Sequence, residues 1–284
     1  MHGDKSREIT AIPELLQALD IQGARSPLFA GGAARWRYDG AMPANPCACA
    51  DHPFADVQVL AFDVFGTVVD WHGSIVREMQ ALYPAVDANA FALAWRARYQ
   101  PALARVRAGA QGWAVLDELH RAMLEEILPR FGLAHLSEAE RRQLSRVWQR
   151  LDAWPDSVAG LARLKTRFII TTLSNGNIAL LTRMAKRAGL PWDCVLSAES
   201  FQAYKPSPAV YRGLARVFDL PAQQLALVAA HHEDLAAARD CGLRTAYVER
   251  PLEFGASQVK DVAPQPGNGL HASCLLDLAR QLGC

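Results

Sequence analysis

The spacing of hydrophobic and polar residues divides the chain into three kinds of stretch. Residues 1–55 contain a single helix-like run, at 12–19, among glycines and prolines, and we expect them to form an extension with little ordered structure. Residues 73–150 are rich in Ala, Arg, Glu and Leu at helical spacing and show no strand pattern. This middle stretch is predicted to form three to five amphipathic helices.

The remaining residues alternate between predicted strands and predicted helices. The run 57–62 is dominated by apolar and β-branched residues, as expected of a strand buried on both faces. The other predicted strands are 167–173, 194–197, 225–229 and 244–248, and the predicted helices are 155–165, 178–188, 208–218, 234–241 and 270–282. This alternation predicts an α/β fold with a parallel sheet and helices on both faces. We expect a Rossmann-like core domain of residues 56–72 and 151–284, with an all-helical cap domain inserted at 73–150.

Charge and hydropathy narrow the range of partners. The chain holds 30 Lys and Arg against 29 Asp and Glu, whereas proteins that bind nucleic acids or membrane surfaces usually carry a basic excess. No apolar run approaches the roughly 18 residues that a membrane-spanning helix needs. The sequence starts without a charged and then apolar leader. We therefore expect a cytoplasmic protein that binds neither nucleic acid nor membrane.

The six cysteines are scattered along the chain and do not form the spacing of a disulfide framework. Cys47, Cys49 and His52 lie close together and could touch a metal ion. A zinc site normally needs a second pair of ligands, which this segment lacks. An inert segment is the preferred interpretation, and no metal site is predicted.

Polar residues stand at or just after the ends of several predicted strands: Asp63, the Ser174-Asn175 pair, Lys205 and Asp234. Each has an ordinary alternative role, as a turn former, a solvated loop residue or a helix N-cap. The carboxyl ends of parallel strands meet at one edge of the sheet, where such folds bind their ligands. The coincidence of all these groups at that edge predicts an active site.

Four segments around these residues resemble the four motifs of the haloacid dehalogenase superfamily. They are FDVFGT at 62–67, TLSNG at 172–176, YKPSPAVY at 204–211 and VAAHHEDL at 228–235. The resemblance is nearest to the type II 2-haloacid dehalogenases and covers about residues 57–255, the helical insert corresponding to that family's cap. It implies hydrolysis of short 2-haloalkanoic acids such as chloroacetate, fluoroacetate or L-2-chloropropionate to 2-hydroxy acids. It also implies that no cofactor is used and that the chain forms a homodimer.

Residue 65 separates two reactions within this superfamily. Phosphatases carry a second Asp at this position, which protonates the leaving alkoxide, and losing such an acid costs about 10²–10⁴-fold in rate. A halide is a weak base that needs no proton, and Phe65 instead supplies an apolar wall for a haloalkyl group. In the fourth motif Glu233 stands beside Asp234, but adjacent residues of a helix do not share a face. We predict a metal-free dehalogenase; a Mg²⁺-dependent phosphatase is the alternative, and a non-catalytic binding protein is the more remote one.

The expected reaction runs through an ester of Asp63, which attacks C2 of the substrate, expels halide and is then released by water. The resemblance implies that Thr67 hydrogen-bonds the nucleophile. It also implies that Lys205 keeps Asp63 ionised and stabilises the charge that develops in ester hydrolysis. Asp234 is expected to anchor Lys205. Either Asp234 or His231 activates the water, and an imidazole that titrates near neutrality suits this task.

The resemblance also assigns the substrate contacts. Ser174 and Asn175 match the residues that hold the substrate carboxylate. Tyr211 matches a tyrosine near the motif lysine, and Trp113 is a candidate for the apolar lining together with Phe65. For Tyr211 and Trp113, plain core packing is the alternative.

Arg96 resembles the cap-domain arginine that receives the departing halide, and Arg98 is the competing candidate. A guanidinium group suits this role because it stays charged at every accessible pH. The insert is rich in arginine, so a solvated helix face is the alternative for both residues.

Overall fold

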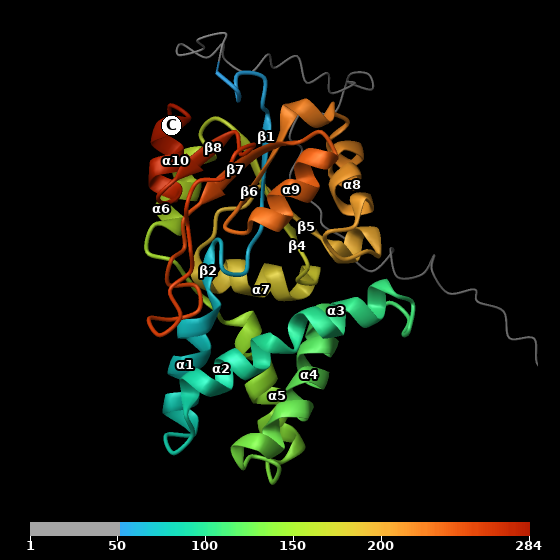
Figure 1. Cartoon of the computed structure of the whole chain (residues 1–284), viewed down its shortest axis with the longest axis vertical. Helices are drawn as coiled ribbons and strands as arrows, with labels where there is room; N and C mark the ends of the chain where they lie inside the picture. The colour runs from blue at the N-terminus through green and yellow to red at the C-terminus, as the bar shows by residue number, and fades with distance from the viewer. Residues whose placement is uncertain (1–51) are drawn as a thin grey trace, which may run out of the picture. The chain divides into compact units, whose positions relative to one another are not determined.

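A six-stranded parallel sheet lies at the centre of residues 52–284, the part of the chain that this computed structural model describes (Figure 1). Its strand order is β5-β4-β1-β6-β7-β8. The strands are β1 (Val59–Phe62), β4 (Ile169–Ser174), β5 (Cys194–Ser197), β6 (Leu225–Ala229), β7 (Arg244–Val248) and β8 (Leu270–Ala272). The predicted α/β architecture is therefore confirmed.

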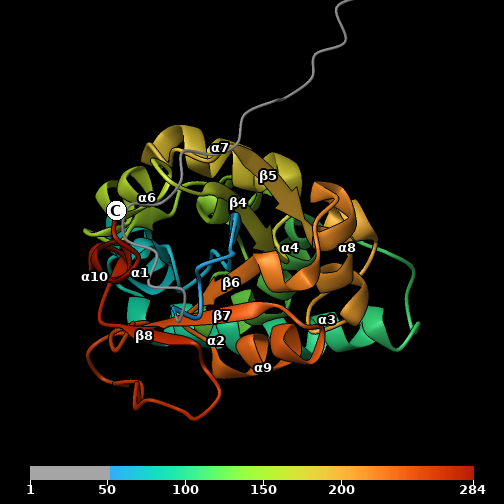
Figure 2. The ribbon, with the colours of Figure 1, turned by 90° about the horizontal axis from the view of Figure 1, so that it is seen from above.

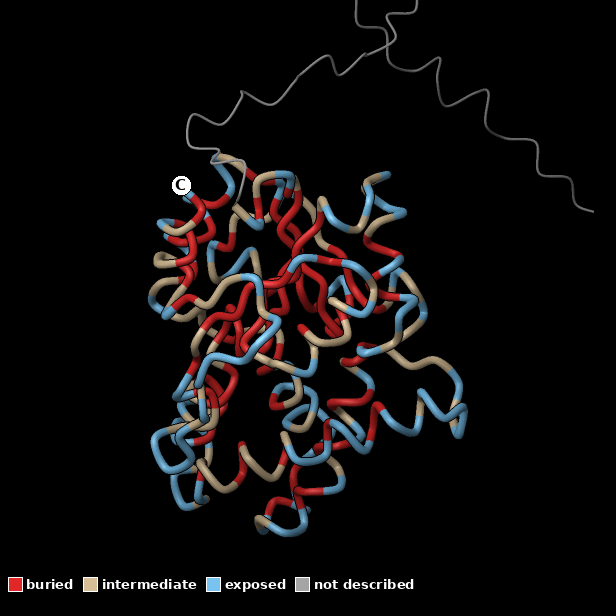
Figure 3. Tube along the Cα trace, turned by 45° about the horizontal axis from the view of Figure 1, so that its top comes forward, coloured by how far each residue is buried: buried red, intermediate tan, exposed pale blue. Residues whose placement is uncertain are grey.

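Helices cover both faces of the sheet, because side chains alternate between the two faces of each strand (Figure 2). The helices of the core are α6 (Ser157–Leu164), α7 (Ile178–Ala188), α8 (Pro208–Phe218), α9 (His232–Asp240) and α10 (Leu275–Gln281). Leu60 and Phe62 of β1 belong to a hydrophobic cluster with residues of α6, α7 and α10. Val59 and Ala61 belong to a second cluster with residues of α8 and α9. β1 is thus buried from both sides. Figure 3 shows buried residues gathered in the interior of the molecule and exposed ones along its outer turns.

A group of helices between β2 and β3 forms the predicted cap (Figure 1). It consists of α1 (Trp71–Leu82), α2 (Ala88–Ala97), α3 (Tyr99–Arg107), α4 (Leu116–Ile127) and α5 (Glu138–Ser145), with 3₁₀ turns at Leu128–Phe131 and Arg146–Gln149. β2 (Val69–Asp70) and β3 (Asp152–Ala153) pair as an antiparallel ladder where the chain enters and leaves this group. A capping box between Ser137 and Glu140 fixes the start of α5.

Several predicted elements occur at their predicted bounds, including α7, whose end is fixed by Gly189 in the left-handed region. The predicted helix 270–282 is wrong in its first part. Leu270–Ala272 pairs with β7 as the edge strand β8, and Cys274 then caps α10. A free strand edge beside a short apolar run outweighed the helical spacing of that run.

The N-terminal expectations fall mostly outside the described residues, since residues 1–51, with Cys47 and Cys49, are not described. His52 accepts a hydrogen bond from the main-chain N–H of Phe54 at Nδ1 (3.1 Å). Phe54, two residues before the predicted start of the core domain, is fully buried. No helix among residues 52–284 has the length and apolar character required to cross a bilayer.

Candidate active site

Asp63 emerges from the carboxyl end of β1, where the main-chain N–H of Asp63 donates to the carbonyl of Val228 (3.0 Å). Its carboxylate is 7% exposed and faces three donors. Thr67 Oγ1 lies 2.8 Å from Oδ2, Lys205 Nζ lies 3.0 Å from Oδ1, and His231 Nδ1 lies 3.1 Å from Oδ2. Burial opposes ionisation, but the charges of Lys205 and His231 outweigh it and hold the pKa of Asp63 well below its usual range. The result is an ionised, fixed carboxylate.

Lys205 joins the nucleophile to Asp234. Its buried ammonium group forms ion pairs with Asp63 and with Asp234 Oδ2. Burial alone would lower the pKa of Lys205, but the two carboxylates raise it, so the side chain stays cationic. The other Asp234 oxygen accepts a hydrogen bond from the Tyr211 hydroxyl (2.6 Å). The contact of Tyr211 given by the structure is therefore with Asp234.

His231 precedes α9 and bridges Asp63 to a carboxylate that the sequence did not reveal. Its Nε2 lies 2.8 Å from Oε1 of Glu253, which is fully buried. Lys260 Nζ lies 2.6 Å from the other oxygen of Glu253. Burial disfavours a charged ring, but Glu253 and Asp63 outweigh it and raise the pKa of His231 to about 9. The expected titration near neutrality is therefore wrong for the free enzyme, because two carboxylates face the ring.

Glu253 and Lys260 lie in the long loop that follows β7, outside all four motifs. Ligands bind beyond the carboxyl ends of parallel strands, and this holds for β7 as well as for β1, β4 and β6. The segment that starts at residue 249, just after β7, is therefore the sequence signal that leads to Glu253.

Asn175 connects Lys205 to the cap. Its Oδ1 accepts a hydrogen bond from the Lys205 main-chain N–H (2.9 Å), and its Nδ2 donates to the Tyr99 hydroxyl (3.0 Å). The Arg96 guanidinium carbon lies 4.2 Å from the centre of the Tyr99 ring. Ser174 is fully buried and accepts a hydrogen bond from the Gly176 N–H. Tyr99 thus brings Arg96 to the nucleophile's edge of the sheet, and no motif had indicated Tyr99.

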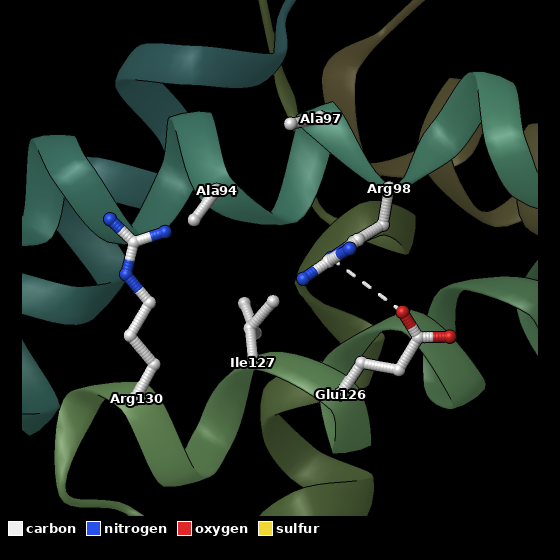
Figure 4. Close-up of a pocket in the computed structure, with 6 residues that line it drawn as sticks. All are labelled: Ala94, Ala97, Arg98, Glu126, Ile127 and Arg130. Atoms are coloured by element: carbon white, nitrogen blue, oxygen red, sulfur yellow. Dashed lines mark ion pairs between the residues drawn. The ribbon is translucent and has the colours of Figure 1, made fainter.

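Arg98 lies in a different place, in a shallow pocket of about 250 Å³ between α2 and α4 (Figure 4). Its Nε lies 3.6 Å from Oε2 of Glu126, and Ala94, Ala97, Ile127 and Arg130 complete the lining. Within residues 52–284, no hydrogen bond joins any of these residues to Asp63, Lys205, His231 or Asp234. The geometry therefore favours Arg96 over Arg98 as the cap arginine of the site.

Aromatic residues surround the nucleophile loop. Phe65 is 4% exposed and packs edge-on against His120 and Trp148, with ring centres 6.2 and 5.9 Å away. It also lies over Gly176, where an added Cβ would come within 3.0 Å of the Phe65 ring. Trp113 stacks on Tyr204, the residue before Lys205, at a ring distance of 4.7 Å. Phe65 therefore gives the nucleophile loop a buried apolar side, and Trp113 packs on the residue before Lys205.

The two adjacent acidic residues of the fourth motif face different surroundings. Glu233 is exposed and Asp234 is turned towards Lys205, as expected for adjacent positions on a helix. Within residues 52–284, no three His, Cys, Asp or Glu side chains are gathered in a way that could hold a metal ion.

Known proteins resemble this chain in sequence and fold. A family model for haloacid dehalogenase-like hydrolases matches residues 57–242. The crystal structure of an L-2-haloacid dehalogenase is 47% identical, covers 80% of this chain and 99% of its own, and superposes with a TM-score of 0.77. That of a defluorinating L-2-haloacid dehalogenase is 42% identical, with coverage of 80% and 96% and a TM-score of 0.77. The (S)-2-haloacid dehalogenase 4A of Burkholderia cepacia is 26% identical over 72% of this chain and 89% of its own. The chain belongs to the haloacid dehalogenase-like hydrolases.

Proposed function

We propose that this chain hydrolyses short 2-haloalkanoic acids to 2-hydroxy acids, with Asp63 as the covalent nucleophile. The observation that carries the proposal is an ionised carboxylate beside an apolar wall, with Phe65 where a phosphatase needs a proton donor. The similarity to L-2-haloacid dehalogenases at 47% and 42% identity supports it. Substrate and water are the only reactants that this reaction requires.

In the first step, an Asp63 oxygen attacks C2 of the substrate, the carbon–halogen bond breaks, and the halide leaves with the bonding electrons. Holding the carboxylate about 3–3.5 Å from C2 replaces a bimolecular encounter by an intramolecular one, an effect equivalent to about 10⁵ M or more. Lys205 and Thr67 fix the carboxylate in one orientation. Arg96, whose charge is permanent, is the proposed acceptor of the halide.

In the second step, water attacks the ester carbonyl, and the bond between that carbonyl carbon and the substrate oxygen breaks. The hydroxyl oxygen of the product then comes from Asp63, and the water oxygen remains in the carboxylate. Lys205 is the proposed stabiliser of the negative charge on the tetrahedral intermediate. Asn175 and Ser174 are the proposed contacts of the substrate carboxylate, Phe65 and Trp113 of its apolar part, and Tyr211 acts through Asp234.

The domain boundaries and the oligomeric state are part of the proposal as well. The β2–β3 ladder supports cap boundaries near residues 73 and 150, with the core formed by 56–72 and 151–284 and an extension before residue 56. The family resemblance supports a homodimer, which light scattering would test.

Halide release from chloroacetate, fluoroacetate and L-2-chloropropionate in the presence of EDTA tests the proposed function. We expect release by the wild type, and none by Asp63→Asn. Asp87→Asn is the matched control, because Asp87 caps α2 on the surface and Asn caps helices equally well. Halide release that needs Mg²⁺, or hydrolysis of an aryl phosphate in its place, would overturn the proposal in favour of the phosphatase alternative.

A further inference from the structure

The two carboxylates that face His231 play different parts in the proposed reaction. Asp63, near Nδ1, becomes a neutral ester in the first step. Glu253, near Nε2, is fully buried and stays charged. Burial alone would raise the pKa of Glu253, but the charges of His231 and Lys260 outweigh it and lower this pKa to about 2. Ester formation therefore removes the negative charge on one side of the ring and leaves the other in place.

This change alters the protonation of His231. In the free enzyme both carboxylates keep the ring charged, and a charged imidazole donates from both nitrogens and accepts no proton. Once Asp63 is esterified, one of the charges that raised the pKa of His231 has gone, so the ring loses a proton more readily. The proton must leave Nδ1, because Nε2–H remains hydrogen-bonded to the Glu253 carboxylate, which can only accept.

Asp234 is poorly placed for the same task. One of its oxygens is in the ion pair with Lys205, and the other accepts the hydrogen bond from the Tyr211 hydroxyl. Both are therefore engaged, whereas Nδ1 of His231 lies 3.1 Å from Oδ2 of Asp63, beside the carbon that water must attack.

We propose that Glu253 is a positioning residue for ester hydrolysis: by holding Nε2–H of His231, it leaves the Nδ1 lone pair facing the Asp63 ester, where it takes a proton from the attacking water. This inference rests on the proposed dehalogenation. Lys260 holds Glu253 in place from its other side, and also contacts the carbonyl of Ala230. In this arrangement His231 is the base, and the Glu253 carboxylate fixes which of its nitrogens carries the proton.

The protons balance through one cycle. After ester formation, charged His231 releases one proton to solvent, which is the proton that the overall reaction produces. Neutral His231 then takes a proton from water as the hydroxide adds to the ester carbonyl carbon. Collapse of the intermediate passes this proton to the leaving alkoxide and gives the 2-hydroxy acid. The remaining Asp63 carboxyl proton returns to His231, which restores the initial pair.

The pH dependence of the hydrolysis step follows from the charges around the ring. These are Asp63 after β1, Lys205 of the third motif, Asp234 on α9, Glu253 and Lys260 in the loop after β7, and, on the far side of Thr67, the Arg250–Asp156 pair. Hydrolysis requires neutral His231, so its rate rises with pH through the pKa of His231 in the ester form. Removing the negative charge of Glu253 moves this rise to lower pH, and removing the positive charge of Lys260 moves it to higher pH.

Glu253→Gln separates the two steps in a pre-steady-state experiment with excess L-2-chloropropionate. We expect a burst of halide equal to the enzyme present, accumulation of the Asp63 ester by mass spectrometry, and ester hydrolysis slowed about 10²–10⁴-fold. The matched control is Glu249→Gln, because Glu249 makes a similar 2.7 Å contact with His271 in a partly exposed place. This control should keep wild-type rates in both steps.

Lys260→Gln keeps the inference testable if Glu253→Gln folds poorly, and a double variant tests whether Glu253 acts through His231. Lys260→Gln should shift the pH profile of hydrolysis upward, opposite to Glu253→Gln. In a His231→Asn background, Glu253→Gln should cause no additional slowing, because Glu253 acts through the ring. Wild-type ester hydrolysis in Glu253→Gln, or equal slowing of both steps with an unmoved pH profile, would overturn this inference while dehalogenation stands. No halide from the wild type with any haloacid would instead refute the proposed function.

Discussion

Replacing Lys205 by Met tests whether the buried charge cluster holds the core together as well as serving catalysis. The Lys205 side chain is 7% exposed and is paired with Asp63 and Asp234, whose side chains are 10% and 11% exposed. Its removal leaves two carboxylates close together in a site that water scarcely reaches. Breaking a buried ion pair in this way costs about 3–5 kcal/mol. For a domain of about this size, 1 kcal/mol corresponds to a Tm change of about 2–4 °C, so we expect a fall of roughly 6–20 °C.

The pH dependence gives the sign of the effect. The folded-state pKa of Asp63 is depressed in the wild type, so its contribution to stability is present above its ordinary pKa of 3.8 and is lost as the pH falls below that value. In Lys205→Met the two carboxylates instead take up protons more readily when folded. The difference in the free energy of unfolding is thus largest near pH 7 and shrinks towards pH 4.

Urea unfolding of both proteins at pH 7, 5 and 4 measures this difference. Lys165→Met is the matched control, because Lys165 lies 2.7 Å from Asp193 in an ion pair whose side chains are 38% and 33% exposed. Such a surface pair contributes about 0–1 kcal/mol. A cost for Lys205→Met no greater than that of the control, or a cost that does not change with pH, would refute the reasoning.

Three other expectations concern the pocket, the core and pH. Tyr99→Phe removes the acceptor of the Asn175 amide, worth about 1 kcal/mol, and should raise KM for chloroacetate roughly fivefold in steady-state kinetics; an unchanged KM would count against this contact. Gly160→Ala places a Cβ 2.6 Å from Cβ of Leu275 and should lower the free energy of unfolding by about 1–3 kcal/mol in urea titrations. An increase in the free energy of unfolding would contradict this, because it would mean that α10 moves aside at little cost. The pKa of His231 is raised to about 9 when folded, so its contribution to stability is complete below its ordinary pKa of 6.5 and is lost as pH rises through 9; unfolding between pH 7 and 10 should show this slope, and His231→Gln should flatten it.

The sequence predicted the centre of the site because its residues follow from strand order. Asp63, Asn175, Lys205 and Asp234 each stand beyond a strand of strong apolar character, and the topology of a parallel sheet places them at one edge. The helical cap was predictable for a related reason, because amphipathic spacing over 73–150 is a local property.

The features that escaped prediction depend on tertiary structure. Glu253 reaches His231 only because the irregular loop after β7 folds back over the nucleophile turn, so closely that a Cβ on Gly66 would lie 2.3 Å from Glu253 Oε1. Gly66 has a φ of +81°, in the left-handed region that favours glycine. Strand β8 gains its identity from its neighbour β7, since its three residues carry little pattern of their own. The periodicity of the sequence reveals neither the contact that a folded loop makes nor the strand that pairs with a short segment.

The position of the nucleophile strand has a consequence for how the enzyme fails. β1 lies inside the sheet, bonded to β4 and β6, so the amide hydrogens of Val59–Phe62 should exchange with solvent only when the whole core opens. Glu253 is carried by a loop whose following residues are mostly exposed, and such segments open at much lower free energy. Mild heating should therefore detach Glu253 while Asp63 still reacts. An enzyme in that state would be alkylated once at Asp63 and would release the product only very slowly, so its own substrate would become its inactivator.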